Sequence, residues 1–161
     1  MLKRAPQMRL RRLQATDADV ILALEADAEV MQHSTGLIQP TPERRGALLA
    51  YIAADHGELG HWAVTSAGST AGWISLTPLA DTTRIQVAYR LARAHWGKGL
   101  ATDALRQACD YAKTHLLLKE LVAVVWPANS RSQRLLERSG FNFECETHHY
   151  GRDVMLYVRP L

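Results

Sequence analysis

The sequence predicts a mixed α/β fold, in which strands and helices follow one another along a single chain. Residues 84–91 alternate apolar and polar side chains, a period of two residues that is typical of a half-buried strand. Residues 100–112 instead carry apolar side chains at every third or fourth position, which indicates an amphipathic helix. The apolar run at 121–126 is continuous, as in a strand that is covered on both faces. A sheet with helices packed against it accounts for all three patterns.

The remaining elements follow from the same two periodicities and from turn-forming residues. The first is a strand at 8–13, followed by a helix with Thr16 or Asp17 as its N-cap and with Val20, Ile21, Leu24, Ala28 and Met31 on its apolar face. A loop at 33–42 leads to a helix at 42–55 with Pro42 in its first turn, and strands at 61–65 and 71–76 follow around a turn at Gly68 and Ser69. After the strand at 121–126 come a helix at 130–139, which ends at Gly140, and two closing strands at 141–149 and 153–159, which meet across Gly151.

Length and composition fit one domain over residues 1–161. The apolar fraction is 47% and the charged fraction is 22%, both ordinary for a soluble globular protein. No stretch approaches the roughly 18 uncharged apolar residues of a membrane-spanning helix, and the first residues lack the apolar segment of a signal peptide. We therefore expect a cytoplasmic protein without membrane contact, as a monomer or a homodimer.

Positive charge is concentrated at the N-terminus, although the net charge is only +3. The first twelve residues contain no acid and five cations, Lys3, Arg4, Arg9, Arg11 and Arg12. A basic arm of this kind could contact RNA or a ribosome. A first strand with Met8 and Leu10 facing inward explains the same residues, and we favour it. Nucleic acid is therefore not expected as a partner.

The cysteines and histidines predict neither a disulfide framework nor a metal site. Cys109 lies on the apolar stripe of a helix, and Cys145 alternates with Phe141 and Phe143 along a strand, so both are expected to be buried. The seven histidines show no metal-ligand spacing, and the neighbours His148 and His149 point to opposite faces of a strand.

A glycine-rich loop joins the strand at 84–91 to the next helix. Gly97-Lys98-Gly99 directly precedes the helix, so several backbone N–H groups point at one spot at the positive end of the helix dipole. Glycine also permits close approach and unusual φ. The loop is therefore suited to a phosphate or pyrophosphate.

Known phosphate motifs fit this loop only in part. A P-loop needs a Ser or Thr directly after the lysine, where Gly99 stands, and a dinucleotide fingerprint needs a third glycine, where Thr102 stands. On this stretch alone, a glycine-rich turn without a ligand also remains open.

A second block, WPANSRSQRLLERSGF at residues 126–141, decides between these interpretations. Together the two blocks resemble the GNAT superfamily of acetyl-coenzyme-A-dependent N-acyltransferases, in the style of its ribosomal-protein N-terminal acetyltransferase branch. The family pattern Q/R-x-x-G-x-G/A falls on Trp96 to Ala101, with Trp96 replacing Gln or Arg. The family's N-x-x-S/A falls on Asn129 and Ser132, and its G-F on the dipeptide that starts at Gly140.

The resemblance implies a GNAT fold: a mixed, twisted sheet of roughly six to seven strands with helices on both faces. In that fold the strands at 84–91 and 121–126 splay apart, and a pantetheine arm bonds to the exposed backbone. Acetyl-coenzyme A is then the co-substrate. The residues implied for its pyrophosphate are Gly97, Lys98, Gly99, Leu100, Ala101 and Thr102, and those for its pantetheine are Tyr89, Arg90 and Leu91. Trp96 and Asn129 are implied as further cofactor-binding residues.

Two alternatives remain for single residues of these motifs. Asn129 could cap the helix or bond to pantetheine, and both roles are compatible. Lys98, Arg93 and Arg134 could meet phosphates, or each could be a solvated charge.

Acetyl transfer from a thioester to an amine calls for a proton donor at the departing thiolate. Many relatives use a tyrosine seven residues after the motif asparagine, but Leu136 occupies that position. Ser132 resembles the serine that the ribosomal-protein branch presents to the sulfur. The same serine could instead bond only to its own helix backbone.

The general base is less clearly indicated. Relatives often carry a glutamate at the position of Gln86, and an amide cannot accept the proton. His33 in the loop at 33–42, which the resemblance places beside the acceptor, is the first candidate. Glu58 and Asp81 are weaker ones, and an already neutral amine could enter without any base.

The sequence thus favours an N-acetyltransferase whose partner is a primary amine, either a protein N-terminus or a small molecule, attacked directly in a ternary complex. A longer acyl chain is a second possibility. The alternative from another class is a non-catalytic acyl-coenzyme-A-binding or ribosome-associated module, which Gln86 and the basic N-terminus motivate.

Overall fold

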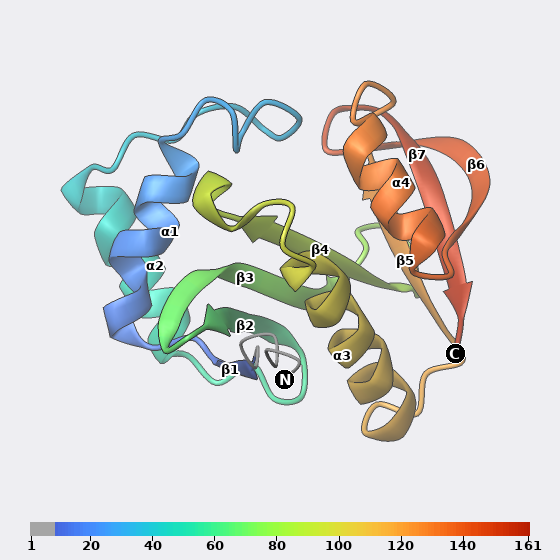
Figure 1. Cartoon of the computed structure of the whole chain (residues 1–161), viewed down its shortest axis with the longest axis horizontal. Helices are drawn as coiled ribbons and strands as arrows, with labels where there is room; N and C mark the ends of the chain where they lie inside the picture. The colour runs from blue at the N-terminus through green and yellow to red at the C-terminus, as the bar shows by residue number, and fades with distance from the viewer. Residues whose placement is uncertain (1–8) are drawn as a thin grey trace, which may run out of the picture.

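A computed structural model describes residues 9–161, so the basic segment ahead of Arg9 lies outside the described residues. The chain forms a seven-stranded sheet in the order β1-β2-β3-β4-β5-β7-β6 (Figure 1). The strands are β1 (Arg9–Arg12), β2 (Gly60–Ser66), β3 (Ser69–Pro78), β4 (Ile85–Leu91), β5 (Glu120–Val125), β6 (Asn142–His149) and β7 (Arg152–Pro160). The helices are α1 (Ala18–Glu25), α2 (Pro42–Ala53), α3 (Leu100–Thr114) and α4 (Ser130–Arg138), with 3-10 turns η1 (Ala15–Asp17) and η2 (Arg93–His95).

The centre of the sheet contains its weakest junction. Every neighbouring pair is antiparallel except β4 and β5, which are parallel and share the single register pair Gln86–Val122. Beyond that pair the two strands separate (Figure 1). The mixed sheet and the splayed central strands agree with the expected fold.

Helices cover both faces of the sheet, as expected. Ile74 of β3 belongs to a core that includes Leu105 of α3 and Leu136 of α4. Its neighbour Trp73 instead packs on the cluster formed by α1 and α2. Because successive side chains of a strand point to opposite faces, α3 and α4 cover one face and α1 and α2 the other.

The first helix is shorter than predicted. It ends at Glu25, and Met31 is buried in the turns that follow it. Asp17 is the N-cap residue, as one of the two expectations had it, but its side chain makes no capping bond, because the carboxylate accepts from the backbone N–H of Gln14 and from Arg11. The second helix begins at Pro42 as expected and ends two residues early, at Ala53.

The prediction for the two cysteines was right for Cys109, which is buried, and wrong for Cys145, which is exposed. β6 is an edge strand, and its register with β7 shifts between Phe143 and Cys145. No residue of this edge strand is buried, and Phe143 is itself 50% exposed, so β6 has no buried face on which Cys145 could lie. Over residues 9–161 no cluster of three His, Cys, Asp or Glu side chains could hold a metal, and no helix is long and apolar enough to cross a membrane.

Gly72 should be required for the pairing of β3 and β4. A Cβ added there would lie 2.0 Å from the Arg90 carbonyl oxygen and 2.8 Å from the Leu91 Cα, so backbone would have to move. Gly72→Ala should lower the free energy of unfolding by at least about 2 kcal/mol. Gly46→Ala is the matched control: Gly46 is exposed in α2 with nothing within 4 Å, and alanine should stabilise that helix by about 0.5–1 kcal/mol. Urea unfolding measures both, and equal effects would contradict this close approach.

Candidate active site

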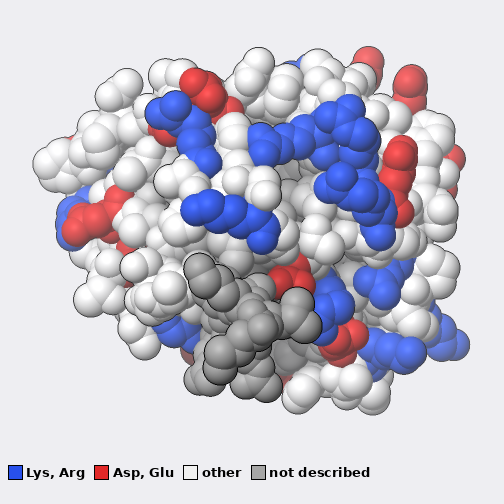
Figure 2. Space-filling view, viewed as in Figure 1, with Lys and Arg blue, Asp and Glu red and all other residues white. Residues whose placement is uncertain are grey.

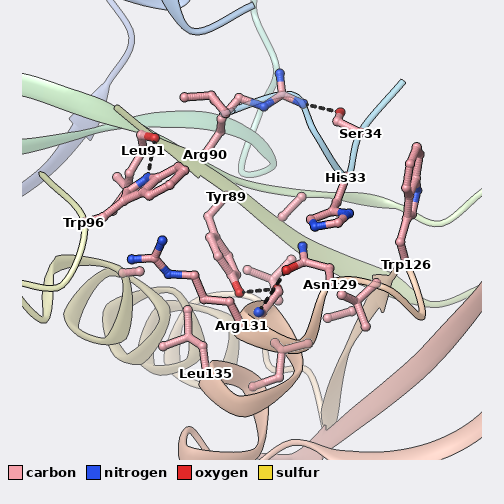
Figure 3. Close-up of a pocket in the computed structure, with 18 of the residues that line it drawn as sticks. His33, Ser34, Tyr89, Arg90, Leu91, Trp96, Trp126, Asn129, Arg131 and Leu135 are labelled. Carbon is pink, nitrogen blue, oxygen red and sulfur yellow. Dashed lines mark hydrogen bonds between the residues drawn. The ribbon is translucent and has the colours of Figure 1, made fainter. Parts of the chain in front are cut away.

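A cleft of about 770 Å³ opens where β4 and β5 separate. Its walls come from β4, β5, the glycine loop, the start of α4 and the segment after α1, so distant parts of the chain meet there (Figure 3). Of the residues expected to bind cofactor or to catalyse, the cleft is lined by His33, Tyr89, Arg90, Leu91, Trp96, Gly97, Gly99, Leu100, Ala101, Thr102, Asn129 and Ser132. The one exception is Lys98, which is exposed and outside the lining.

The glycine loop has the backbone that a phosphate cradle needs. Gly97 and Gly99 have φ of 72° and 78°, and Gly99 is the N-cap of α3. A Cβ at either glycine would meet nothing within 4 Å, so the protein itself leaves the space above the loop open. The first intrahelical bond runs from the N–H of Asp103 to the carbonyl of Gly99, which leaves the N–H groups of the preceding turn without helical acceptors.

Trp96 ties this loop to the end of β4. Its indole N–H donates to the Leu91 carbonyl oxygen at 2.8 Å, and the Arg131 guanidinium lies over its ring at 4.3 Å (Figure 3). Tryptophan in place of the usual Gln or Arg therefore has a local structural role. Arg131 was missed at the sequence level, because nothing in its spacing connects it with Trp96.

A pair of hydroxyl groups faces the cleft at the start of α4. The Tyr89 hydroxyl and Ser132 Oγ are 2.7 Å apart, and the Ser132 backbone N–H donates to Asn129 Oδ1 at 3.1 Å (Figure 3). Burial raises the pKa of the Tyr89 hydroxyl, which outweighs the opposite effect of the bond to Ser132, so Tyr89 stays protonated. Asn129 caps α4, and the serine side chain bonds to a tyrosine rather than to its own helix backbone. From the period of two along β4, the sequence could have predicted that Tyr89 lies on the face of the sheet toward α4, but not that it bonds to Ser132.

The candidate bases differ in position. His33 lines the cleft, and its ring lies edge-on to Trp126 with centroids 6.3 Å apart (Figure 3). Gln86 is buried in the cleft wall, where its amide N–H donates to the Tyr150 hydroxyl at 2.5 Å. Glu58 and Asp81 are not among the lining residues.

Some of the remaining arginines line the cleft and others do not. Arg90 lines the cleft and donates to Ser34 Oγ at 2.7 Å. Arg93 pairs with Asp27 at 2.8 Å and Glu29 at 3.3 Å, and Arg134 is not among the lining residues. Lys and Arg side chains nevertheless gather over α4, beside the cleft (Figure 2).

A splayed α/β sheet with a glycine loop at a helix start and a part-buried tyrosine–serine pair is the arrangement expected of an acyltransferase. Residues 7–142 match the family model described as Acetyltransferase (GNAT) domain. The chain therefore belongs to the GNAT acetyltransferase family, as the two sequence blocks indicated. Because the chain belongs to this family, its co-substrate is acetyl-coenzyme A.

Similar proteins carry related names. The chain is 27% identical over 164 residues to the uncharacterized N-acetyltransferase p20 of Bacillus licheniformis, covering 96% of this chain and 92% of that protein. Its fold matches an acetyltransferase from Agrobacterium tumefaciens with a TM-score of 0.82 at 20% identity, over 98% and 93% of the two chains. It also matches a spermidine N-acetyltransferase from Vibrio cholerae, solved with CoA and spermine, with a TM-score of 0.80 at 22% identity over 96% and 95%.

Behind the cleft, His61 should make stability depend on pH. Its ring packs on Trp73 with centroids 4.9 Å apart, and its Nδ1 is 2.5 Å from the Tyr51 hydroxyl. Burial first, and then the charges of His56 and Arg90, lower the pKa of His61 from 6.5 to about 4. Between these two pKa values the unfolded chain binds the proton more readily than the folded chain. The contribution of the neutral His61 to the free energy of unfolding is therefore complete above about pH 6.5 and declines as the pH falls toward 4.

Urea unfolding at pH 7 and pH 5 tests this dependence. His61→Gln should reduce the loss of stability between the two pH values, whereas His115→Gln, at the exposed end of α3, should leave it unchanged. An NMR titration of His61 with a midpoint above pH 6 would contradict the assignment.

Proposed function

We propose that this protein transfers an acetyl group from acetyl-coenzyme A to a primary amine, by direct attack in a ternary complex. The observation that carries the proposal is the convergence in one cleft of the glycine loop, the exposed strand backbone and the Tyr89–Ser132 pair. Acetyl-coenzyme A supplies the activated acyl group. The two free cysteines are compatible with work in a reducing cytoplasm.

The cofactor would follow the cleft from the loop to the sheet. The N–H groups of Gly97 and Gly99 to Thr102 would bind the pyrophosphate at the positive end of α3. The backbone of residues 89–91 would pair with the pantetheine amides, because β5 does not occupy that side of β4. Asn129 lies beside this path, and its capping bond leaves the amide N–H₂ free to donate.

Ser132 and Tyr89 would manage the leaving group. The amine nitrogen forms a bond to the thioester carbon, the carbon–sulfur bond breaks, and the thiolate takes a proton. Ser132 Oγ–H gives its proton to the sulfur, and the Tyr89 O–H, which orients Ser132 Oγ by donating to it, replaces that proton and is itself reprotonated by solvent. Since Tyr89 stays protonated, the pair presents a donor at neutral pH.

His33 would accept the amine proton, directly or through water. It is the candidate base that lines the cleft, and it lies on the segment after α1 rather than on the sheet. Gln86 would hold Tyr150 in position without taking part in proton transfer.

The phosphate cradle is tested by Gly99→Asp. A carboxylate there faces the phosphates with like charge, so affinity for acetyl-coenzyme A should fall at least about tenfold in calorimetry. Gly68→Asp is the matched control: Gly68 has φ of 82°, an open Cβ position and a place in the β2–β3 turn outside the cleft. Both variants carry the same charge change and similar backbone strain. Equal affinities for the two folded variants would refute the cradle.

The leaving-group role is tested by Ser132→Ala. A positioned proton donor contributes about 10²- to 10⁴-fold, so kcat should fall at least about tenfold with little change in the KM for acetyl-coenzyme A. Stability should fall by no more than about 1–2 kcal/mol. Ser130→Ala, exposed in the same helical turn, should leave thiol release unchanged. Wild-type kcat in Ser132→Ala would mean that water or another group protonates the thiolate, and binding without turnover of any amine would favour an acyl-coenzyme-A-binding module.

A further inference from the structure

The two faces of β4 meet different parts of the cleft. Tyr89 points toward α4, where it bonds to Ser132. The next side chain, Arg90, points to the face that α1 and α2 cover, where its guanidinium lies over Trp73 at 5.2 Å and bonds to Ser34 (Figure 3). Gln86 and Ala88 share the Arg90 face by the period of two. All three residues line the cleft, and Ala88 ends at Cβ, so it adds no longer side chain to the wall between the other two.

Arg90 carries a charge that no acid on the chain balances. Among residues 9–161 no carboxylate oxygen lies within 4.0 Å of its guanidinium, and the undescribed residues 1–8 include no Asp or Glu. The acid whose charge acts on Arg90 is the buried Glu25, but both of its oxygens bond to Arg44, one of them to Nε at 2.9 Å. These three charges therefore sum to +1, and among residues 9–161 the hydrogen-bond partner of the Arg90 side chain is the neutral Ser34.

This excess charge matters because Arg90 is largely shielded from water. Burial lowers the pKa of its guanidinium, yet an arginine remains protonated in a protein. A buried cation normally has an anionic partner or is paired by a ligand. Bonded through one Nη to Ser34, the planar guanidinium still has N–H donors in the fork geometry that matches a carboxylate.

The rest of the cleft carries the same sign. Its other charged lining residues, His apart, are Arg131, Arg138 and Glu29, and Glu29 pairs with Arg93 at 3.3 Å. Arg131 lies over Trp96 on the side of the glycine loop, which leaves Arg90 as the cation on the α1–α2 side. A polycationic amine would meet repulsion here, whereas an amine with an anionic group would gain attraction.

We propose that the acceptor is a small primary amine that also bears a carboxylate, such as an α-amino acid, and that Arg90 binds this carboxylate. The proposal rests on the proposed acetyl transfer and selects among its possible acceptors. The amine then lies over Ala88, near the point where β4 and β5 separate, and the carboxylate reaches the guanidinium. A purely structural Arg90, linking β4 to the segment after α1 through Ser34, is the competing explanation.

Matched pairs of acceptors separate the two explanations in the unaltered protein. Thiol release from acetyl-coenzyme A is measured with each of a panel of amino acids and with its own carboxamide. The carboxamide has the same shape and a larger neutral-amine fraction, so without a carboxylate-binding group it is the better acceptor. We expect kcat/KM to favour the carboxylate at least about tenfold. An equal or better kcat/KM for the carboxamides would overturn the proposal.

Two variants then assign the preference to a residue. Arg90→Gln should lower kcat/KM at least tenfold more for the amino acid than for its carboxamide, and Arg90→Lys should have an intermediate effect because it keeps the charge and loses the fork. Arg106→Gln removes an equally large cation from the outer surface of α3 and should leave the preference intact. A preference that survives in folded Arg90→Gln would place the carboxylate elsewhere and overturn the assignment.

Calorimetry of amino acid binding to the coenzyme-A-bound protein keeps this proposal distinct from acetyl transfer itself. Arg90-dependent binding with no thiol release from any amine would refute the transfer and support the carboxylate site. Thiol release without any preference for carboxylates would support the transfer and refute the carboxylate site.

Discussion

The single register pair between β4 and β5 is the constraint on which the rest of the site depends. A parallel pair that continued through the sheet would satisfy the backbone N–H and C=O groups of both strands and close the centre. Here pairing ends after Gln86–Val122, and the backbone of residues 89–91 turns toward a cleft instead of toward β5. An extended ligand can complete the sheet at that point. The exposed strand backbone is thus produced by the fold rather than by any one side chain.

Contacts at the end of β4 hold this separation in place. The Trp96 indole bonds to the last carbonyl of the strand, and Gly72 allows β3 to approach the backbone of Arg90 and Leu91 without a Cβ between them. The same indole positions the glycine loop that begins α3. The phosphate-type loop and the unpaired strand are therefore coupled through one side chain, and a change at Trp96 would affect both.

Local features of the site could be predicted from the sequence, and long-range pairings could not. The glycine loop, the cap at Asn129 and the Pro42 helix start are set by residues within a few positions of one another, and each lies where its pattern indicated. The Tyr89–Ser132 and Arg90–Ser34 bonds join residues 43 and 56 positions apart, so no periodicity predicts them. Cys145 was misplaced for a related reason, because its burial depends on what covers the strand, and β6 is a sheet edge without a buried residue.

The neutral Gln86 and the unbalanced Arg90 belong to one electrostatic arrangement. Both lie on the same face of β4, four residues or about 13 Å of strand apart. A glutamate at position 86 would place a second charge in this wall and attract the guanidinium or a cationic acceptor. The amide instead bonds to Tyr150 and leaves the positive charge of Arg90 uncompensated by the chain. Under the two proposals above, the Gln86 amide takes no proton, so the base lies outside the sheet, and Arg90 keeps its charge for an anionic acceptor.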